Sequence, residues 1–130
     1  MAKNKYIVYV EDDEDDLMLV EEIMEDDNNI SLVTLKDGQE LLDFLEDQRD
    51  GEFPILIIMD NNTPRLSGVE ASKIIRQDEE WQNIELVILT TSASPTFIDQ
   101  LSASNVKVIT KPSTFTEWQQ LFNTFLAQIQ

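Results

Sequence analysis

The chain has 130 residues, of which 42% are apolar, enough to build the core of one compact domain. It carries 26 acidic residues against 9 Lys and Arg, so its formal net charge is −17. This excess argues against binding to nucleic acids or to anionic membrane surfaces, because both require cationic side chains. The chain contains no cysteine and no histidine, which excludes disulfides, thiolate chemistry and imidazole as a base, metal ligand or phosphodonor.

Short apolar runs alternate with amphipathic stretches from one end of the chain to the other. The apolar runs predict strands at residues 6–10, 31–35, 55–59, 86–89 and 106–109. The run at 55–59 is the most apolar, so we expect it to form the central strand, buried on both faces. No apolar run approaches the length of a membrane helix or a signal peptide, and we therefore expect a cytoplasmic protein.

Helical spacing of apolar residues predicts a helix after each strand, around residues 17–24, 41–45, 69–75, 97–101 and 115–125. Asp37 and Gly38 predict a turn before the second helix. We expect Ser94 and Thr114 to cap the last two helices. The acids at 13–16 are expected to begin the first helix as a solvated surface, and Trp118 is expected in the core.

Five strand–helix repeats predict an α/β fold with a parallel sheet covered on both faces. Right-handed crossovers favour the flavodoxin-like (βα)5 arrangement with strand order 2-1-3-4-5. We expect residues 1–130 to form a single domain with no output domain after it.

Polar residues follow the predicted strands at the sheet edge where such folds bind ligands. Glu11 and Asp12 follow the first strand, and Asp60 follows the third. Carboxylates in one crevice raise each other's pKa or recruit a cation, and oxygen ligands without His or Cys favour Mg²⁺. With Lys111 as a cation and Thr90 as a hydroxyl, the parts needed for phosphoryl transfer to Asp60 are present.

These motifs resemble those of receiver domains of the two-component response regulator family, and the resemblance covers essentially the whole chain. Glu11 and Asp12 match the acidic pair after the first strand of that family. Asp60 matches the phosphoacceptor, within the similar pattern Asp60-x-Asn62-x-Pro64-x-x-x-Gly68. The resemblance implies that the backbone carbonyl of Asn62 joins Glu11, Asp12 and Asp60 in binding Mg²⁺.

The remaining motifs lie at the ends of the last two strands. Thr90 matches the family's switch hydroxyl best, although Thr91 stays an alternative. Lys111 and Pro112 match the lysine–proline pair, whose peptide bond is usually cis in the family.

The resemblance implies a stand-alone receiver that accepts a phosphoryl group on Asp60 from a histidine kinase or a histidine phosphotransfer protein. Such a domain catalyses its own phosphorylation and dephosphorylation and is not a turnover enzyme. A downstream protein would bind the face formed by the fourth helix, fifth strand and fifth helix. We expect a monomer or a weak dimer.

Two departures from the family keep an alternative open. Val108 stands where the family carries a switching aromatic residue, and Ser104 and Asn105 replace the common Gly-Ala before the last strand. The alternative is a pseudo-receiver that binds partners without phosphoryl chemistry. A turnover phosphatase of the dehalogenase type is disfavoured, because Asn62 stands where that mechanism needs a second aspartate.

Overall fold

Strands and helices alternate strictly along the chain. The computed structural model describes residues 5–25, 29–92 and 94–129. Within these residues the strands are β1 (Lys5–Val10), β2 (Ile30–Leu35), β3 (Leu56–Asp60), β4 (Glu85–Thr90) and β5 (Lys107–Thr110). The helices are α1 (Glu14–Met24), α2 (Gly38–Asp47), α3 (Gly68–Gln77), α4 (Pro95–Ala103) and α5 (Phe115–Ile129).

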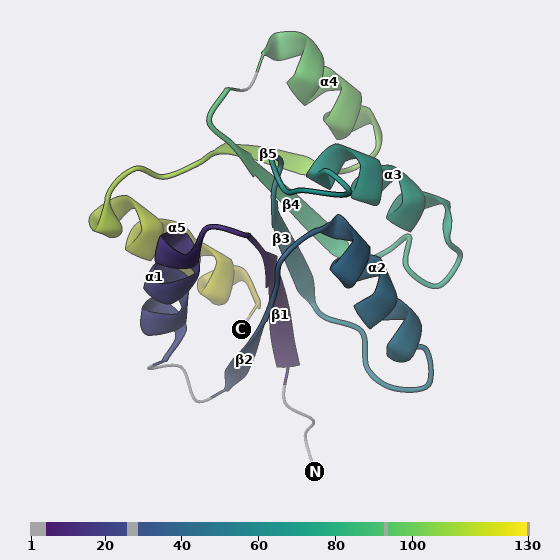
Figure 1. Cartoon of the computed structure of the whole chain (residues 1–130), viewed down its shortest axis with the longest axis horizontal. Coiled ribbons are helices and arrows are strands. Elements are labelled where there is room, and N and C mark those ends of the chain that lie inside the picture. Colours follow the sequence, from purple (N-terminus) through teal and green to yellow (C-terminus); the bar gives the residue numbers. More distant parts are fainter. Residues whose placement is uncertain (1–4, 26–28, 93, 130) are drawn as a thin grey trace.

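The strands form one parallel sheet in the order β2-β1-β3-β4-β5, which confirms the predicted fold. The apolar residues 56–59 of the central strand β3 are buried as predicted, and Asp60 at the end of the strand is buried with them. Helices α1 and α5 cover one face of the sheet, and α2, α3 and α4 cover the other (Figure 1). This order places the carboxyl ends of β1 and β3 side by side in the middle of the sheet.

Two apolar layers hold the helices to the sheet, because alternate residues of each buried strand point to opposite faces. Val8 and Ile57 point into the layer under α2, α3 and α4, whereas Tyr9 and Ile58 point into the layer under α1 and α5. Trp118 of α5 lies in the second layer with only 2% of its surface exposed, which confirms its prediction as a core residue.

The predicted helix caps at the last two helices are confirmed. The Ser94 hydroxyl accepts the backbone N–H of Phe97, and the Thr114 hydroxyl accepts that of Glu117, both at 3.2 Å. The turn predicted at Asp37 and Gly38 is confirmed for Asp37, which lies in a bend between β2 and α2, but the prediction extended one residue too far. Asp37 is itself the N-cap of α2, accepting from the Glu40 backbone at 2.9 Å, and Gly38 is the first residue of that helix.

None of the helices among the described residues combines the length and the apolar character that crossing a bilayer requires.

Candidate functional site

The first feature of the site is a group of three carboxylates at the ends of β1 and β3. Val10 pairs with Met59, so the residues that follow, Glu11 and Asp60, lie at the same edge of the sheet. One carboxylate oxygen from each of Glu11, Asp12 and Asp60 lies within 4.8 Å of the others. Glu11 and Asp60 are buried, while Asp12 is exposed. This acid cluster, predicted from sequence, offers only oxygen ligands and fits a hard divalent cation.

Lys111 reaches the acid cluster from the end of β5. Its Nζ lies 2.8 Å from Glu11 Oε1, 2.9 Å from Asp16 Oδ2 and 3.5 Å from Asp60 Oδ2. Its backbone N–H donates to the carbonyl of Thr90 at 2.9 Å, which holds the lysine beside the end of β4. The structure therefore brings together the predicted carboxylates and the predicted lysine.

The buried charged groups in the site shift one another's pKa values. Burial raises the pKa of Glu11 to about 7; the hydrogen bond from Lys111 opposes this rise, and the negative charge of Asp60 adds to it. Burial alone would lower the pKa of Lys111, but its bonds to Glu11 and Asp16 outweigh burial and raise the pKa instead. Lys111 therefore stays a cation at neutral pH.

Two residues of the site were not predicted from sequence. The hydroxyl of Tyr9 donates to Glu11 Oε1 at 2.8 Å. Residues two apart in a strand share a face, so the spacing of Tyr9 and Glu11 was the available signal. The expectation that all of residues 13–16 form a solvated surface is wrong for Asp16, which pairs with Lys111. Asp13 caps α1 instead, accepting from the backbone of Asp15 at 2.9 Å.

The hydroxyl residues after β4 differ in burial. Thr90 is 3% exposed at the end of the strand, and its hydroxyl accepts the backbone N–H of Ser92 at 3.2 Å. Thr91 is exposed. Of the two threonines, Thr90 therefore has its hydroxyl fixed beside the strand ends, while Thr91 projects to the surface side.

The other expected residues lie around the rim of the site. Asn62 is exposed in the turn after β3. Val108 pairs with Ile88 and packs, partly buried, against the apolar layer under α2, α3 and α4. The described residues contain no cis peptide bond, so the expectation of a cis bond between Lys111 and Pro112 is wrong.

The loop from β3 to α3, which follows Asp60, is tied to the start of α2. Arg65 lies in the left-handed region at φ 65°, and its guanidinium donates to both oxygens of Asp37, at 2.9 and 3.2 Å. Gly38 donates its backbone N–H to the carbonyl of Leu66 at 3.2 Å. These contacts hold the loop beside the acid cluster.

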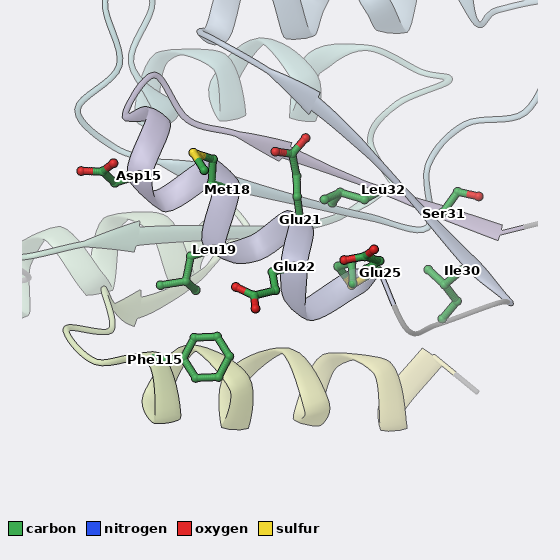
Figure 2. A pocket seen from close by; sticks show the side chains of 11 residues that line it. Asp15, Met18, Leu19, Glu21, Glu22, Glu25, Ile30, Ser31, Leu32 and Phe115 are labelled. Atoms are coloured by element: carbon green, nitrogen blue, oxygen red, sulfur yellow. The ribbon is translucent and has the colours of Figure 1, made fainter.

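An open groove of about 890 Å³ lies elsewhere, between α1, β2 and the first turn of α5 (Figure 2). Met18 and Phe115 line it and are 66% and 45% exposed. Asp15, Glu21 and Glu22 also line it, and Figure 2 shows Phe115 on α5 facing the α1 side. The groove includes no member of the acid cluster, so it is separate from the candidate phosphoryl site.

The fold and the acid cluster together define a class of protein. The chain belongs to the response regulator receiver domain family, whose sequence model matches residues 7–123. Members of this family work with histidine kinases in two-component phosphorelays.

Particular relatives are response regulators too. The chain is 36% identical to Response regulator Rcp1 of Synechocystis sp. over 92 residues, which make up 68% of this chain and 63% of Rcp1. It is 30% identical to the polar-differentiation response regulator DivK of Brucella anthropi over 89 residues, 68% of each chain. The match thus spans less than two thirds of Rcp1.

Solved structures give the same result for the fold. The Mn²⁺-bound form of Rcp1 superposes with a TM-score of 0.82 at 27% identity, covering 94% of each chain. The phosphorylated cyanobacterial phytochrome response regulator RcpA superposes with a TM-score of 0.85 at 27% identity, covering 95% of this chain and 91% of RcpA. The predicted family and fold are both confirmed.

Proposed function

We propose that this chain accepts a phosphoryl group on Asp60 from the phosphohistidine of a histidine kinase or phosphotransfer protein, in a reaction that requires Mg²⁺. The observation that carries the proposal is the convergence of Glu11, Asp12 and Asp60 within 4.8 Å, with Lys111 Nζ 3.5 Å from Asp60. The relatives support it, since one solved structure is Mn²⁺-bound and another is phosphorylated.

In this proposal Glu11, Asp12 and Asp60 hold the cation, with the backbone carbonyl of Asn62 as a further ligand implied by the family. All of these are oxygen donors, which suits Mg²⁺. When bound, Mg²⁺ supplies positive charge that offsets the charge on the transferred phosphoryl oxygens.

The chain's own residues carry the transfer. A carboxylate oxygen of Asp60 attacks the phosphorus, a new O–P bond forms, and the N–P bond breaks with its electron pair returning to the donor's imidazole. Lys111, held as a cation beside Asp60, faces the developing charge. Thr90 supplies the hydroxyl at the adjacent strand end. Water later attacks the acyl phosphate, which restores the Asp60 carboxylate and releases inorganic phosphate.

The output in this proposal is protein binding through the face of α4, β5 and α5. The added phosphoryl charge lies near Thr90 and Lys111. The backbone N–H of Lys111 donates to the Thr90 carbonyl at 2.9 Å, so the two residues respond together to phosphorylation.

The test is incubation with acetyl phosphate and Mg²⁺ followed by intact-protein mass spectrometry. We expect the wild type to gain the mass of one phosphoryl group and Asp60→Asn to gain none. Asp47→Asn, which removes an exposed acid on α2, is the matched control and should label like the wild type. Equal labelling of Asp60→Asn and the wild type would rule out Asp60 as the acceptor.

The second candidate is a pseudo-receiver that binds partners without phosphorylation. The observation in its favour is Val108, a small side chain at the position of the family's switching aromatic residue. A wild type that neither binds Mg²⁺ at millimolar concentration nor labels with acetyl phosphate would support this candidate.

A further inference from the structure

Tyr9 is a buried residue whose hydroxyl contacts the acid cluster. Its exposed fraction is 0%, and its ring packs edge-on against Trp118 and Phe122 at centroid distances of 6.1 and 6.2 Å. Its hydroxyl lies 2.8 Å from Glu11 Oε1. Burial raises the pKa of Tyr9, and the negative charge of Glu11 raises it further, so the hydroxyl keeps its proton and acts as a donor.

The two oxygens of Glu11 have different partners. Oε1 accepts from both Tyr9 and Lys111, each at 2.8 Å. Oε2 accepts only the backbone N–H of Asp13, at the longer distance of 3.3 Å, among the described hydrogen bonds. A carboxylate oxygen has about two lone-pair directions, so Oε1 is fully used and Oε2 retains one for another ligand.

The two donors to Oε1 also differ in rigidity. Lys111 is shared among Glu11, Asp16 and Asp60 on a flexible four-carbon stem. The Tyr9 ring is fully buried and packs against two aromatic rings of α5, so it can place its hydroxyl in few positions. Tyr9 is therefore the more rigid of the two donors that hold the Glu11 carboxylate.

We propose that Tyr9 is a positioning residue, which fixes Oε1 of Glu11 and thereby presents Oε2 to the divalent cation. This inference rests on the proposed function, because it requires the acid cluster to bind Mg²⁺. Outer partners of metal ligands act in this way elsewhere, by setting the orientation of the ligand.

The first test is Mg²⁺ affinity measured by calorimetry on Tyr9→Phe, which keeps the ring and removes only the hydroxyl. We expect binding about tenfold weaker than in the wild type, the lower end of the loss seen for such partners. Tyr6→Phe is the matched control, because the chain has two tyrosines and the Tyr6 hydroxyl donates to the Glu52 carbonyl instead. Its Mg²⁺ affinity should equal that of the wild type.

The second test reads the tyrosine ring directly in the wild type and uses the variants only for assignment. NMR of protein labelled at the tyrosine Cζ gives two signals, assigned through Tyr6→Phe and Tyr9→Phe. Mg²⁺ should shift the Tyr9 signal and leave the Tyr6 signal in place, because Glu11 changes charge distribution when its second oxygen is ligated. A tyrosine that merely fills the core would show no such shift.

A third measurement separates positioning from general destabilisation. In a Glu11→Gln background, Tyr9→Phe should weaken Mg²⁺ binding no further, since the group it orients is gone. An equal loss in both backgrounds would overturn the inference, as would unchanged Mg²⁺ affinity in Tyr9→Phe. A wild type that binds no Mg²⁺ at all would instead overturn the proposed function.

Discussion

The pKa of Glu11 is subject to opposing effects of its surroundings. The side chain is buried beside Asp60, which favours the protonated acid, yet it accepts hydrogen bonds from Tyr9 and Lys111, which favour the carboxylate. The net result is a carboxyl that releases its proton only near neutral pH. The metal-free protein therefore holds a carboxylate that is costly to keep charged, which is a common property of functional sites.

This cost predicts a pH dependence of stability in the metal-free protein. The pKa of Glu11 is about 7 in the folded chain against 4.5 for a free glutamate side chain. The folded state thus holds this proton more tightly, so the stability that Glu11 contributes is fully present below about pH 4.5 and is lost as pH rises through about 7. Between about pH 5 and pH 8 the loss is on the order of 2–3 kcal/mol.

The measurement is urea unfolding in EDTA at several pH values, with the wild type compared to Glu11→Gln. The glutamine keeps the shape and cannot titrate, so the other acids of the chain cancel in the difference. We expect the free energy of unfolding of the wild type to fall relative to that of Glu11→Gln as pH rises. A difference that stays constant across this range would contradict the raised pKa.

Sequence analysis predicted the site residues that directly follow strands, but it missed the site residues that lie inside a strand or a helix. Glu11, Asp60 and Lys111 were predictable because parallel strands end at one edge of the sheet. Tyr9 lies inside β1, where an aromatic residue is explained well enough by packing. Asp16 lies in the first turn of α1, and a run of acids there is ordinarily explained by solvent and the helix dipole.

Among the elements, the close approach of α2 to the loop between β3 and α3 matters most for the site. A Cβ on Gly38 would lie 2.5 Å from the Leu66 carbonyl oxygen and 2.9 Å from the Leu66 Cβ. Glycine is needed here for space, because the neighbouring atoms belong to the backbone and to the first side-chain atom and cannot rotate away. The start of α2 thereby fixes the loop that begins at Asp60.

We predict that Gly38→Ala lowers the free energy of unfolding by about 2 kcal/mol, although alanine is intrinsically the better helix former. Urea unfolding of the purified variant measures this. Gly51→Ala is the matched control, because its new Cβ would meet Gln48 Oε1 at an ordinary 3.6 Å. That variant should be as stable as the wild type or up to about 1 kcal/mol more stable. Equal changes in the free energy of unfolding for the two substitutions would contradict the predicted crowding at Gly38.

The strands were predicted to within about one residue because each is a continuous apolar run, which a two-sided parallel sheet requires. The start of α2 was predicted less accurately. Asp37 and Gly38 form a dipeptide typical of turns, but aspartate is also a favoured N-cap, which is its role here. The contact with Leu66, distant in sequence, explains why the first helical residue is glycine.

For the whole molecule, the formal net charge of −17 on 130 residues is the dominant electrostatic fact. Few of these charges are paired by the 9 Lys and Arg, so the folded state carries a large self-repulsion that the extended chain relieves. The same field favours partners that present basic surfaces.

We predict that salt stabilises the protein. Raising sodium chloride from about 20 to about 200 mM should raise Tm by about 3–6 °C in EDTA, because screening weakens repulsion in the compact state. Differential scanning calorimetry measures this. Choline chloride at the same ionic strength is the control, since its bulky cation does not fit the acid cluster. A rise with sodium but not with choline would show that site binding, and not screening, is responsible.

The rings behind Glu11 have a practical consequence. Tyr9 contacts Trp118, Trp118 contacts Phe122, and Phe122 contacts Phe125, so one aromatic row runs from the acid cluster into the core. The other tryptophan, Trp81, lies under the Arg49 guanidinium in the opposite layer. Replacing Trp81 with phenylalanine would leave Trp118, which contacts Tyr9, as the single tryptophan of the chain. Its emission would follow occupancy of the cluster in real time, without any attached dye.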